Sequence, residues 1–289
     1  MDAAPWGFTR RDPLVLIKGA GDLASGVAHR LCRAHLRVVM TESPQPLAVR
    51  RTVSFCEAVH RGRQTVEGVD AVRAASVDEL AAAWSQGGIP VLVDPDLTCL
   101  AWLKPDVLVE ATIAKRNLGL SKAMAPLVIA LGPGFQAGVD AHLVVETKRG
   151  HDLGRIYEEG WAIPNTGVPG EVMGVGAARV LRAPADGVFE PVVELGAMVA
   201  EGQVVGRVAG QPVRAGVAGL VRGLIRPGIQ AHQGLKLGDV DPRGCLDYLH
   251  TISDKARALG GAVLEAVLRA YNQAQAGQPP PGSGPPPRV

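Results

Sequence analysis

Residues 14–31 read LVLIKGAGDLASGVAHRL, so an apolar run stands directly before glycines and an amphipathic pattern follows directly after them. This order predicts a buried strand over 14–18, a turn at Gly19 and Gly21, and a helix over 23–35. Glycines let a backbone approach a ligand closely, and free N–H groups at a helix N-terminus attract negative charge. We therefore expect the turn to bind a small phosphate-bearing ligand.

The composition excludes several classes of partner. The chain has 289 residues, and its net charge is only +2 because 28 acidic side chains offset 30 basic ones. Without a strong positive field we expect no nucleic-acid partner. Apolar runs are too short to span a membrane and the N-terminus lacks the apolar core of a signal peptide, so we expect a cytoplasmic protein without a membrane partner. The 4 cysteines are widely spaced, which argues against a metal site.

The rest of the N-terminal half alternates between strand-like and helix-like segments. Apolar runs predict strands or extended chain at 37–40, 65–72, 90–93, 106–111 and 127–131. Apolar spacing predicts a helix over 47–59, a capping box at Ser76 opens a helix that reaches Trp84, and a helix-like piece lies between the last two strands. This alternation predicts the α/β class with a Rossmann-like, mostly parallel sheet.

The character of the sequence changes near residue 180. From there to 242, short β-like runs are separated by glycines, which predicts a small all-β domain. A capped helix follows over 255–271, and the tail QPPPGSGPPPRV cannot pack. The expected divisions are an N-terminal extension at 1–13, a Rossmann-like domain at 14–179, the all-β domain at 180–242, a C-terminal helix at 243–274 and a disordered tail at 275–289.

The first group of candidate binding residues surrounds the glycine turn. Gly19 and Gly21 form the turn, Gly26 lies beyond them, and Glu42 ends the second strand, where dinucleotide-binding folds place a ribose-binding carboxylate. Asp22 is unusual because a carboxylate at this point repels phosphate, unless it turns away and caps the helix or coordinates another group. The alternative is a Rossmann-like domain that binds no dinucleotide.

Further candidates stand near the expected carboxyl ends of strands. Arg50 and Arg51 can clamp a phosphate or carboxylate with two parallel hydrogen bonds, although a solvated helix face also explains such a pair. Thr112, Gly132 and Gly134 follow predicted strands, and open α/β sheets bind ligands along that edge. We include all five residues in the expected ligand site.

The densest polar cluster, DAHLVVETKRGH, lies at 140–151. On a strand, Asp140, His142 and Glu146 share one face and offer an acid–base pair or metal ligands. No spacing here matches a closed metal site, so we expect no metal. A role in binding an anion or substrate fits better, with Lys148 and the arginine after it adding positive charge.

Several long segments resemble the YqeB family of the selenium-dependent molybdenum hydroxylase system. They are KGAGDLASGVAHRL (18–31), TESPQPLAVRRTVSFCEAV (41–59), ALGPGFQAGVDAHLVVETKRGHDLGR (130–155), PNTGVPG (164–170), GDVDPRG (238–244) and TISDKARALGGAVLEA (251–266). The resemblance implies a role in maturing molybdenum hydroxylases. A more distant similarity is to XdhC-type accessory proteins, which carry a Rossmann-like domain and bind molybdenum cofactor.

The glycine-rich region resembles a biotinyl/lipoyl-like barrel-sandwich. Residues 183–208 look like its first half and residues 214–240 like its second. Carrier domains of that type present a lysine on the hairpin between the halves, but AGQPV at 209–213 contains none. We therefore expect no covalent biotin or lipoate, and a scaffold or docking role for this part of the chain.

Three functions remain open from the sequence. The first is an accessory protein that holds molybdenum cofactor or a nucleotide and docks a molybdenum hydroxylase client, with Asp140, His142 and Glu146 lining the reactive side. The second is an NAD(P)-dependent oxidoreductase that uses His142 or Lys148 as the acid–base group. The third is a non-catalytic scaffold with a degenerate nucleotide fold. Homo-oligomerisation is also left open.

Overall fold

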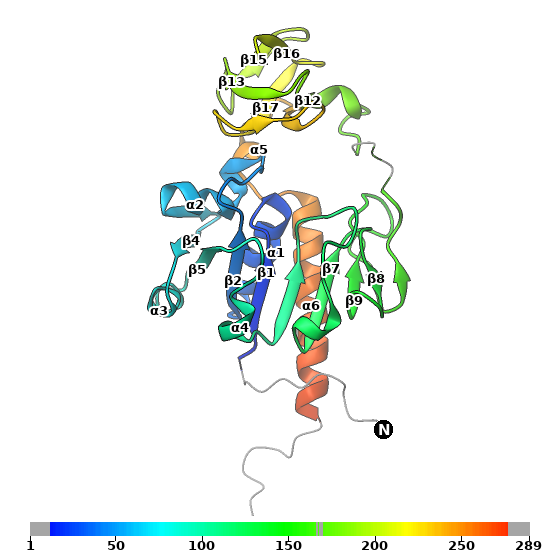
Figure 1. Cartoon of the computed structure of the whole chain (residues 1–289). Helices are drawn as coiled ribbons and strands as arrows, with labels where there is room; N and C mark the ends of the chain where they lie inside the picture. Colours follow the sequence, from blue (N-terminus) through cyan, green and yellow to red (C-terminus); the bar gives the residue numbers. More distant parts are fainter. Residues whose placement is uncertain (1–11, 166, 168–169, 277–289) are drawn as a thin grey trace, which may run out of the picture.

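The computed structural model describes residues 12–165, 167 and 170–276. Figure 1 shows a large sheet with helices on its faces and a small β module, residues 180–241, above one end of that sheet. Most of the expected N-terminal extension and C-terminal tail, and part of the 164–170 loop, lie outside the described residues. Within the described part of the chain, no helix combines the length and apolar character needed to cross a bilayer.

Within the described residues the large sheet has nine strands in the order β10-β9-β7-β6-β1-β2-β5-β4-β3. Neighbouring strands are parallel except at the two edges, where β3 is antiparallel to β4 and β10 is antiparallel to β9. The strands are β1 (Leu14–Lys18), β2 (Arg37–Glu42), β3 (Arg63–Val66), β4 (Val69–Ala74), β5 (Ile89–Val93), β6 (Val107–Glu110), β7 (Leu127–Leu131), β9 (Leu143–Val145) and β10 (Ile156–Tyr157).

The two faces of the sheet bury separate apolar cores. Side chains alternate along a strand, so Val15 and Ile17 of β1 join one core while Leu14 and Leu16 join the other. Burial on both faces explains why the central strands are almost wholly apolar. The first core is covered by α1 (Asp22–Arg33) and α6 (Asp254–Ala276), and the second by α3 (Val77–Ser85) and α4 (Leu100–Leu103).

Helices α1 and α6 touch through glycines. A Cβ atom on Gly26 would lie 2.6 Å from the Cβ of Ala256, and one on Gly260 would lie 2.8 Å from the carbonyl oxygen of Gly26. Both distances are far below van der Waals contact, so any side chain would force the helices apart. The close approach brings the first turn of α6 next to the turn that follows β1.

The small β module consists of two antiparallel sheets around its own core. Within the described residues one sheet has the order β12-β19-β17-β14 and the other β16-β15-β13-β18. Phe189 and Leu237 are fully buried between them. The strands are β12 (Val180–Arg182), β13 (Gly187–Pro191), β14 (Met198–Val199), β15 (Val204–Val208), β16 (Gln211–Arg214), β17 (Gly219–Leu224), β18 (Gln230–Ala231) and β19 (Lys236–Asp241).

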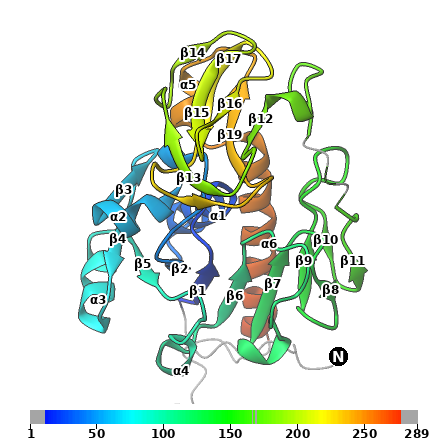
Figure 2. The same ribbon diagram turned by 45° about the horizontal axis from the view of Figure 1, so that its top comes forward.

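The module is fastened to the chain that follows β2. The Leu224 backbone N–H donates to the Val49 carbonyl over 2.8 Å, and Arg51 Nε donates to the Leu224 carbonyl, also over 2.8 Å. The Arg226 guanidinium lies 2.6 Å from the buried carboxylate of Glu57. In Figure 2 the module lies over the ends of α1 and α6. These bonds make the module a fixed part of the molecule.

Several predicted elements are confirmed and others are not. The strand at 127–131 and the helix capped by Ser76 form as expected. The predicted 47–59 helix is wrong, because the chain there makes two 3₁₀ turns and only then enters α2 (Ala58–Arg61). The extended segment 65–72 is part of the β3–β4 hairpin, and the helix-like piece before β7 is only the 3₁₀ turn Lys122–Met124.

The fold class expected from the sequence is also corrected. The large sheet is mixed, with antiparallel strands at both edges, and the connection from β6 to β7 has no α-helix to cover the sheet. Instead, α6 arrives from the far end of the chain to cover that face. The glycine-rich region forms small antiparallel sheets, and the expected Rossmann-like domain followed by a biotinyl/lipoyl-like barrel-sandwich is replaced by this mixed-sheet architecture.

Candidate functional site

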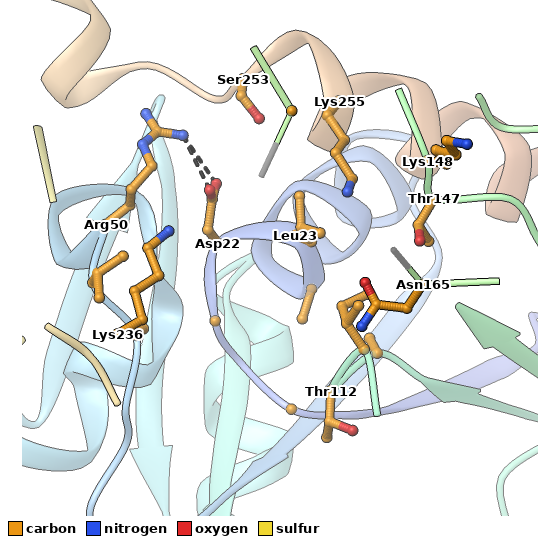
Figure 3. Close-up of a pocket in the computed structure, with 18 of the residues that line it drawn as sticks. Asp22, Leu23, Arg50, Thr112, Thr147, Lys148, Asn165, Lys236, Ser253 and Lys255 are labelled. Atoms are coloured by element: carbon orange, nitrogen blue, oxygen red, sulfur yellow. Dashed lines mark hydrogen bonds and ion pairs between the residues drawn. The ribbon is translucent and has the colours of Figure 1, made fainter. Parts of the chain in front are cut away.

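A cavity of about 810 Å³ lies between the small β module and the large sheet. Its walls come from the turn after β1, the start of α1, the chain at 47–50, the loop after β9, strand β19 and the first turn of α6. Figure 3 shows side chains from these elements converging on one space. The volume suits a small-molecule ligand.

The glycine turn forms one wall of this cavity, and hydrogen bonds to residues of β2 hold it in place. Gly19 has φ +95°, a backbone conformation that favours glycine, and its N–H donates to the Thr41 carbonyl over 2.8 Å. Glu42 accepts hydrogen bonds from the backbone N–H groups of Ala20 at 2.9 Å and Ser43 at 2.7 Å. The bond from Ala20 fastens the turn to the end of β2, while the bond from Ser43 holds the Glu42 carboxylate in position.

Asp22 turns away from the helix end and pairs with Arg50. Arg50 Nη1 lies 3.1 and 3.2 Å from the two carboxylate oxygens of Asp22, and its Nη2 donates to the carbonyls of Tyr248 and Thr251. The Arg50 side chain is only 6% exposed, although it lines the cavity. Arg50 thus ties the start of α1 to the chain before α6, and Arg51 is bound to the module and does not line the cavity.

The other predicted glycines serve packing around the cavity. Gly26 lies in the contact between α1 and α6, and it does not line the cavity. A Cβ atom on Gly134 would lie 2.2 Å from the Ala114 carbonyl oxygen, while Gly132 has φ +94°. Neither lines the cavity, but Thr112 does, and its hydroxyl donates to Glu110 over 2.6 Å.

The three candidate acid–base residues do not converge. Strand β9 is shorter than expected, so Asp140 and His142 precede it and Glu146 follows it. Asp140 accepts a hydrogen bond from the Gln136 N–H at 2.8 Å, and His142 Nδ1 accepts one from the Val128 N–H at 2.9 Å. Of the three, Glu146 alone lines the cavity. The expectation that they share one strand face is therefore corrected.

Glu146 organises the loop after β9. Its side chain is fully buried and accepts hydrogen bonds from the backbone N–H groups of Lys148 at 2.6 Å and Ile163 at 2.7 Å. These bonds hold the loop so that Thr147 and Lys148 line the cavity. Glu146 has a positioning role in this arrangement.

Four lysines face the cavity without a protein partner. Within the described residues, no hydrogen bond or ion pair involves the Nζ atoms of Lys115, Lys148, Lys236 or Lys255. Other lysines of the chain lie elsewhere, at Lys18, Lys104 and Lys122. The four come from different segments: the loop after β6, the loop after β9, β19 and α6. Free ammonium groups therefore surround the cavity.

The arginines of the lining, by contrast, are all paired. Arg149 donates to Asp254 over 2.8 Å. Arg222 lies 2.9 Å from Asp239, and Arg179 pairs with the same carboxylate. Asp22, Glu42 and Glu146 are likewise engaged, as described above. Lysines and arginines outnumber the carboxylates of the lining, and the lysine Nζ atoms have no hydrogen bond or ion pair within the described residues, so the cavity is cationic.

Two of these lysines, Lys236 and Lys255, have pKa values below the ordinary lysine value. Burial lowers the pKa of Lys236, and the positive charges of Arg179 and Arg222 lower it further. Burial also lowers the pKa of Lys255, with Arg149 acting in the same direction. Protein surrounds both ammonium groups on several sides while leaving them accessible from the cavity.

The sequence pointed to this cavity but missed most of its lysines. Gly19, Gly21, Asp22, Glu42, Arg50, Thr112 and Glu146 line it, as does Lys148. Lys115, Lys236 and Lys255 were not expected there. No local motif marks them, because segments far apart in sequence bring them together. The sequence marks these lysines only by their rarity, because most basic residues of the chain are arginines.

Comparison with known proteins adds a relative but no activity. No protein-family model matches the chain. It is 49% identical, over 260 residues, to a protein of Escherichia coli K12 described as uncharacterized protein YqeB. That match includes 90% of this chain but 48% of the relative, so the chain spans about half the length of the curated relative it matches.

Several solved structures have a remote likeness to this chain. They include the product-bound ectoine utilization protein EutE (DoeB) from Ruegeria pomeroyi, at 17% identity and a TM-score of 0.24, covering 79% of this chain and 85% of that one. A succinylglutamate desuccinylase/aspartoacylase from Rhodobacter sphaeroides matches at 18% and 0.26, over 79% and 85%. TM-scores this low assign no activity to this chain.

These findings correct the functions expected from the sequence. Some of the matched structures carry desuccinylase or aspartoacylase descriptions, and the YqeB relative is uncharacterized. Neither a molybdenum hydroxylase accessory role nor an NAD(P)-dependent oxidoreductase is supported, and both are set aside. The expected cofactors, client protein and homo-oligomer are not tested by the comparisons.

Proposed function

We propose that this chain binds a small anion with several negative charges in the cavity between the small β module and the large sheet. The observation that carries the proposal is the ring of four lysines without protein partners. Like charges gathered around one space repel each other, and an anion placed among them removes that repulsion. The bound anion supplies negative charge that offsets the positive charge of the four lysines.

The N-terminus of α1 supports the same ligand chemistry. The helix starts at the cavity, and its N-cap residue Gly21 offers no side chain to satisfy the first N–H groups. Asp22 does not cap them either, because Arg50 holds its carboxylate. The partial positive charge of the helix end therefore adds to that of the lysines.

Calorimetric titration with citrate and with pyrophosphate, at constant ionic strength, tests the proposal. We expect binding by the wild type and at least about a tenfold weaker affinity in the double variant Lys148→Gln, Lys255→Gln, because each lost charge-assisted hydrogen bond is worth about 1.5–3 kcal/mol before solvent screening.

Lys104→Gln is the matched control, since Lys104 is exposed and lies outside the cavity. It removes the same charge from the molecule without touching the proposed site. The absence of binding for both anions contradicts the proposal, and so does an equal loss of affinity in the control.

A further inference from the structure

Lys236 and Lys255 enter the cavity on either side of Asp22. Figure 3 shows this arrangement, with Lys236 coming from β19 and Lys255 from α6. Asp22 acts electrostatically on both ammonium groups. Arg50 fixes the orientation of the Asp22 side chain, and the two unpaired amines lie on either side of this ion pair. Anion binding alone does not require two lysines arranged around a carboxylate.

We propose that the Lys236 amine captures the carbonyl carbon of the bound anion as an imine. The ligand is then an aldehyde or ketone that carries carboxylate or phosphate groups. This inference rests on the proposed function, because the lysine ring must first bring the anion into the cavity. It deepens that function by naming the nucleophile and the substrate class.

The surroundings of Lys236 favour a neutral amine, which is the nucleophilic form. The groups that act on it are Asp239, Arg179, Asp22 and Arg222. Both guanidinium groups are held in place by Asp239. A lysine that is partly desolvated beside fixed cations releases its proton more easily, and lysine nucleophiles are activated in this way.

More carboxylates than guanidinium groups act on Lys255, and this environment suits anion binding. The charged groups that act on it are Arg149 and the three carboxylates of Asp22, Glu146 and Asp254. These carboxylates oppose the effect of burial and favour the ammonium form of Lys255. Lys255 therefore holds an acidic group of the ligand while Lys236 reacts.

The step balances without a further reactant. The Lys236 ammonium gives a proton to solvent water, and the neutral nitrogen adds to the carbonyl carbon while the carbonyl electron pair moves to oxygen. That oxygen takes up the nitrogen proton and then a second proton from solvent. It leaves as one water molecule as the carbon–nitrogen double bond forms. The product is a protonated imine, and no electrons are exchanged with an outside group.

Trapping with borohydride tests this step. Pyridoxal 5′-phosphate serves as the probe, since it joins an aldehyde to a phosphate, and borohydride reduction makes any imine permanent. Peptide mass spectrometry then locates the label. We expect one label, on Lys236, at equimolar probe, and we expect an excess of pyridoxine 5′-phosphate to prevent it. That competitor has the same ring and phosphate but an alcohol in place of the aldehyde.

Lys236→Arg separates imine formation from anion binding. The variant keeps a positive charge but lacks the amine, so we expect loss of the label while binding of pyridoxine 5′-phosphate is still detected by calorimetry. Lys104→Arg is the control and retains the label on Lys236.

A label spread over Lys104 and other exposed lysines, or placed on Lys255, overturns the inference. Binding of pyridoxine 5′-phosphate without a label on Lys236 also overturns it while leaving the proposed function intact. If neither citrate, pyrophosphate nor pyridoxine 5′-phosphate binds, the proposed function itself fails.

Discussion

The two sides of the cavity treat charge differently. On the glycine-turn side, the carboxylates of Asp22 and Glu42 and both Nη atoms of Arg50 are engaged in bonds within the protein. On the lysine side, Lys148 and Lys255 have hydrogen-bonding capacity that no described residue uses. The comparison teaches that a charged residue in a cavity can serve the fold or a ligand, and that its existing partners distinguish the two.

Replacing Arg50 is expected to have the largest effect on the free energy of unfolding. Arg50→Ala leaves the Asp22 carboxylate and the carbonyls of Tyr248 and Thr251 without their donor. Removing one partner of a buried ion pair typically costs about 3–5 kcal/mol, and we expect a loss of that size in the free energy of unfolding, measured by urea denaturation.

Lys148→Ala is the matched variant on the lysine side. It removes an exposed cation with no bond to break, so its free energy of unfolding should change by less than about 0.5 kcal/mol. Equal losses in the two variants would erase the proposed difference between the two sides.

Replacing Glu42 is expected to lower the free energy of unfolding by a smaller amount. Glu42→Gln replaces one of two acceptor oxygens with an NH₂ group that faces a backbone N–H, either of Ala20 or of Ser43. An unsatisfied donor costs about 1–3 kcal/mol, and we expect a loss in that range in the free energy of unfolding. Glu190→Gln, at an exposed position of β13, is the control and should leave stability unchanged. A neutral Glu42→Gln would mean that the carboxylate does not fasten the turn.

Local patterns in the sequence predicted much of the fold. Ser76 accepts a hydrogen bond from the Glu79 N–H, as in a capping box, while the Glu79 side chain reaches back one residue further, to the Ala75 N–H. The apolar run at 127–131 is a buried strand with those same bounds. Both features depend on neighbours in sequence, which the pattern contains.

Features set by distant contacts were not predictable in this way. The 47–59 segment has helical spacing, but Val49 gives its carbonyl to Leu224 and Phe55 is wholly buried, so tertiary contacts override the local preference. The coverage of the sheet by α6 depends on Gly26 and Gly260, whose fit appears only when the two helices meet. The same reason explains why Arg50 was expected to hold a ligand and holds Asp22 instead.

The pH dependence of anion binding sharpens the comparison on the lysine side. The pKa values of Lys236 and Lys255 lie below the ordinary lysine value of 10.5, first because of burial. A bound anion favours the ammonium forms, so binding takes up protons and affinity falls as pH rises through the lowered pKa values. Citrate affinity, measured by calorimetry at constant ionic strength, should fall about five- to tenfold, roughly 1–1.4 kcal/mol, as pH rises from neutrality toward 10.5.

The double variant Lys236→Gln, Lys255→Gln should bind citrate more weakly and show a flatter profile, because the groups that titrate early are gone. Lys104→Gln should keep the wild-type profile, since Lys104 is exposed and outside the cavity. An affinity that stays constant or rises with pH in the wild type would show that these two lysines do not hold the anion. In that case the lysine side would serve the fold, as the glycine-turn side does, and the contrast between the two sides would disappear.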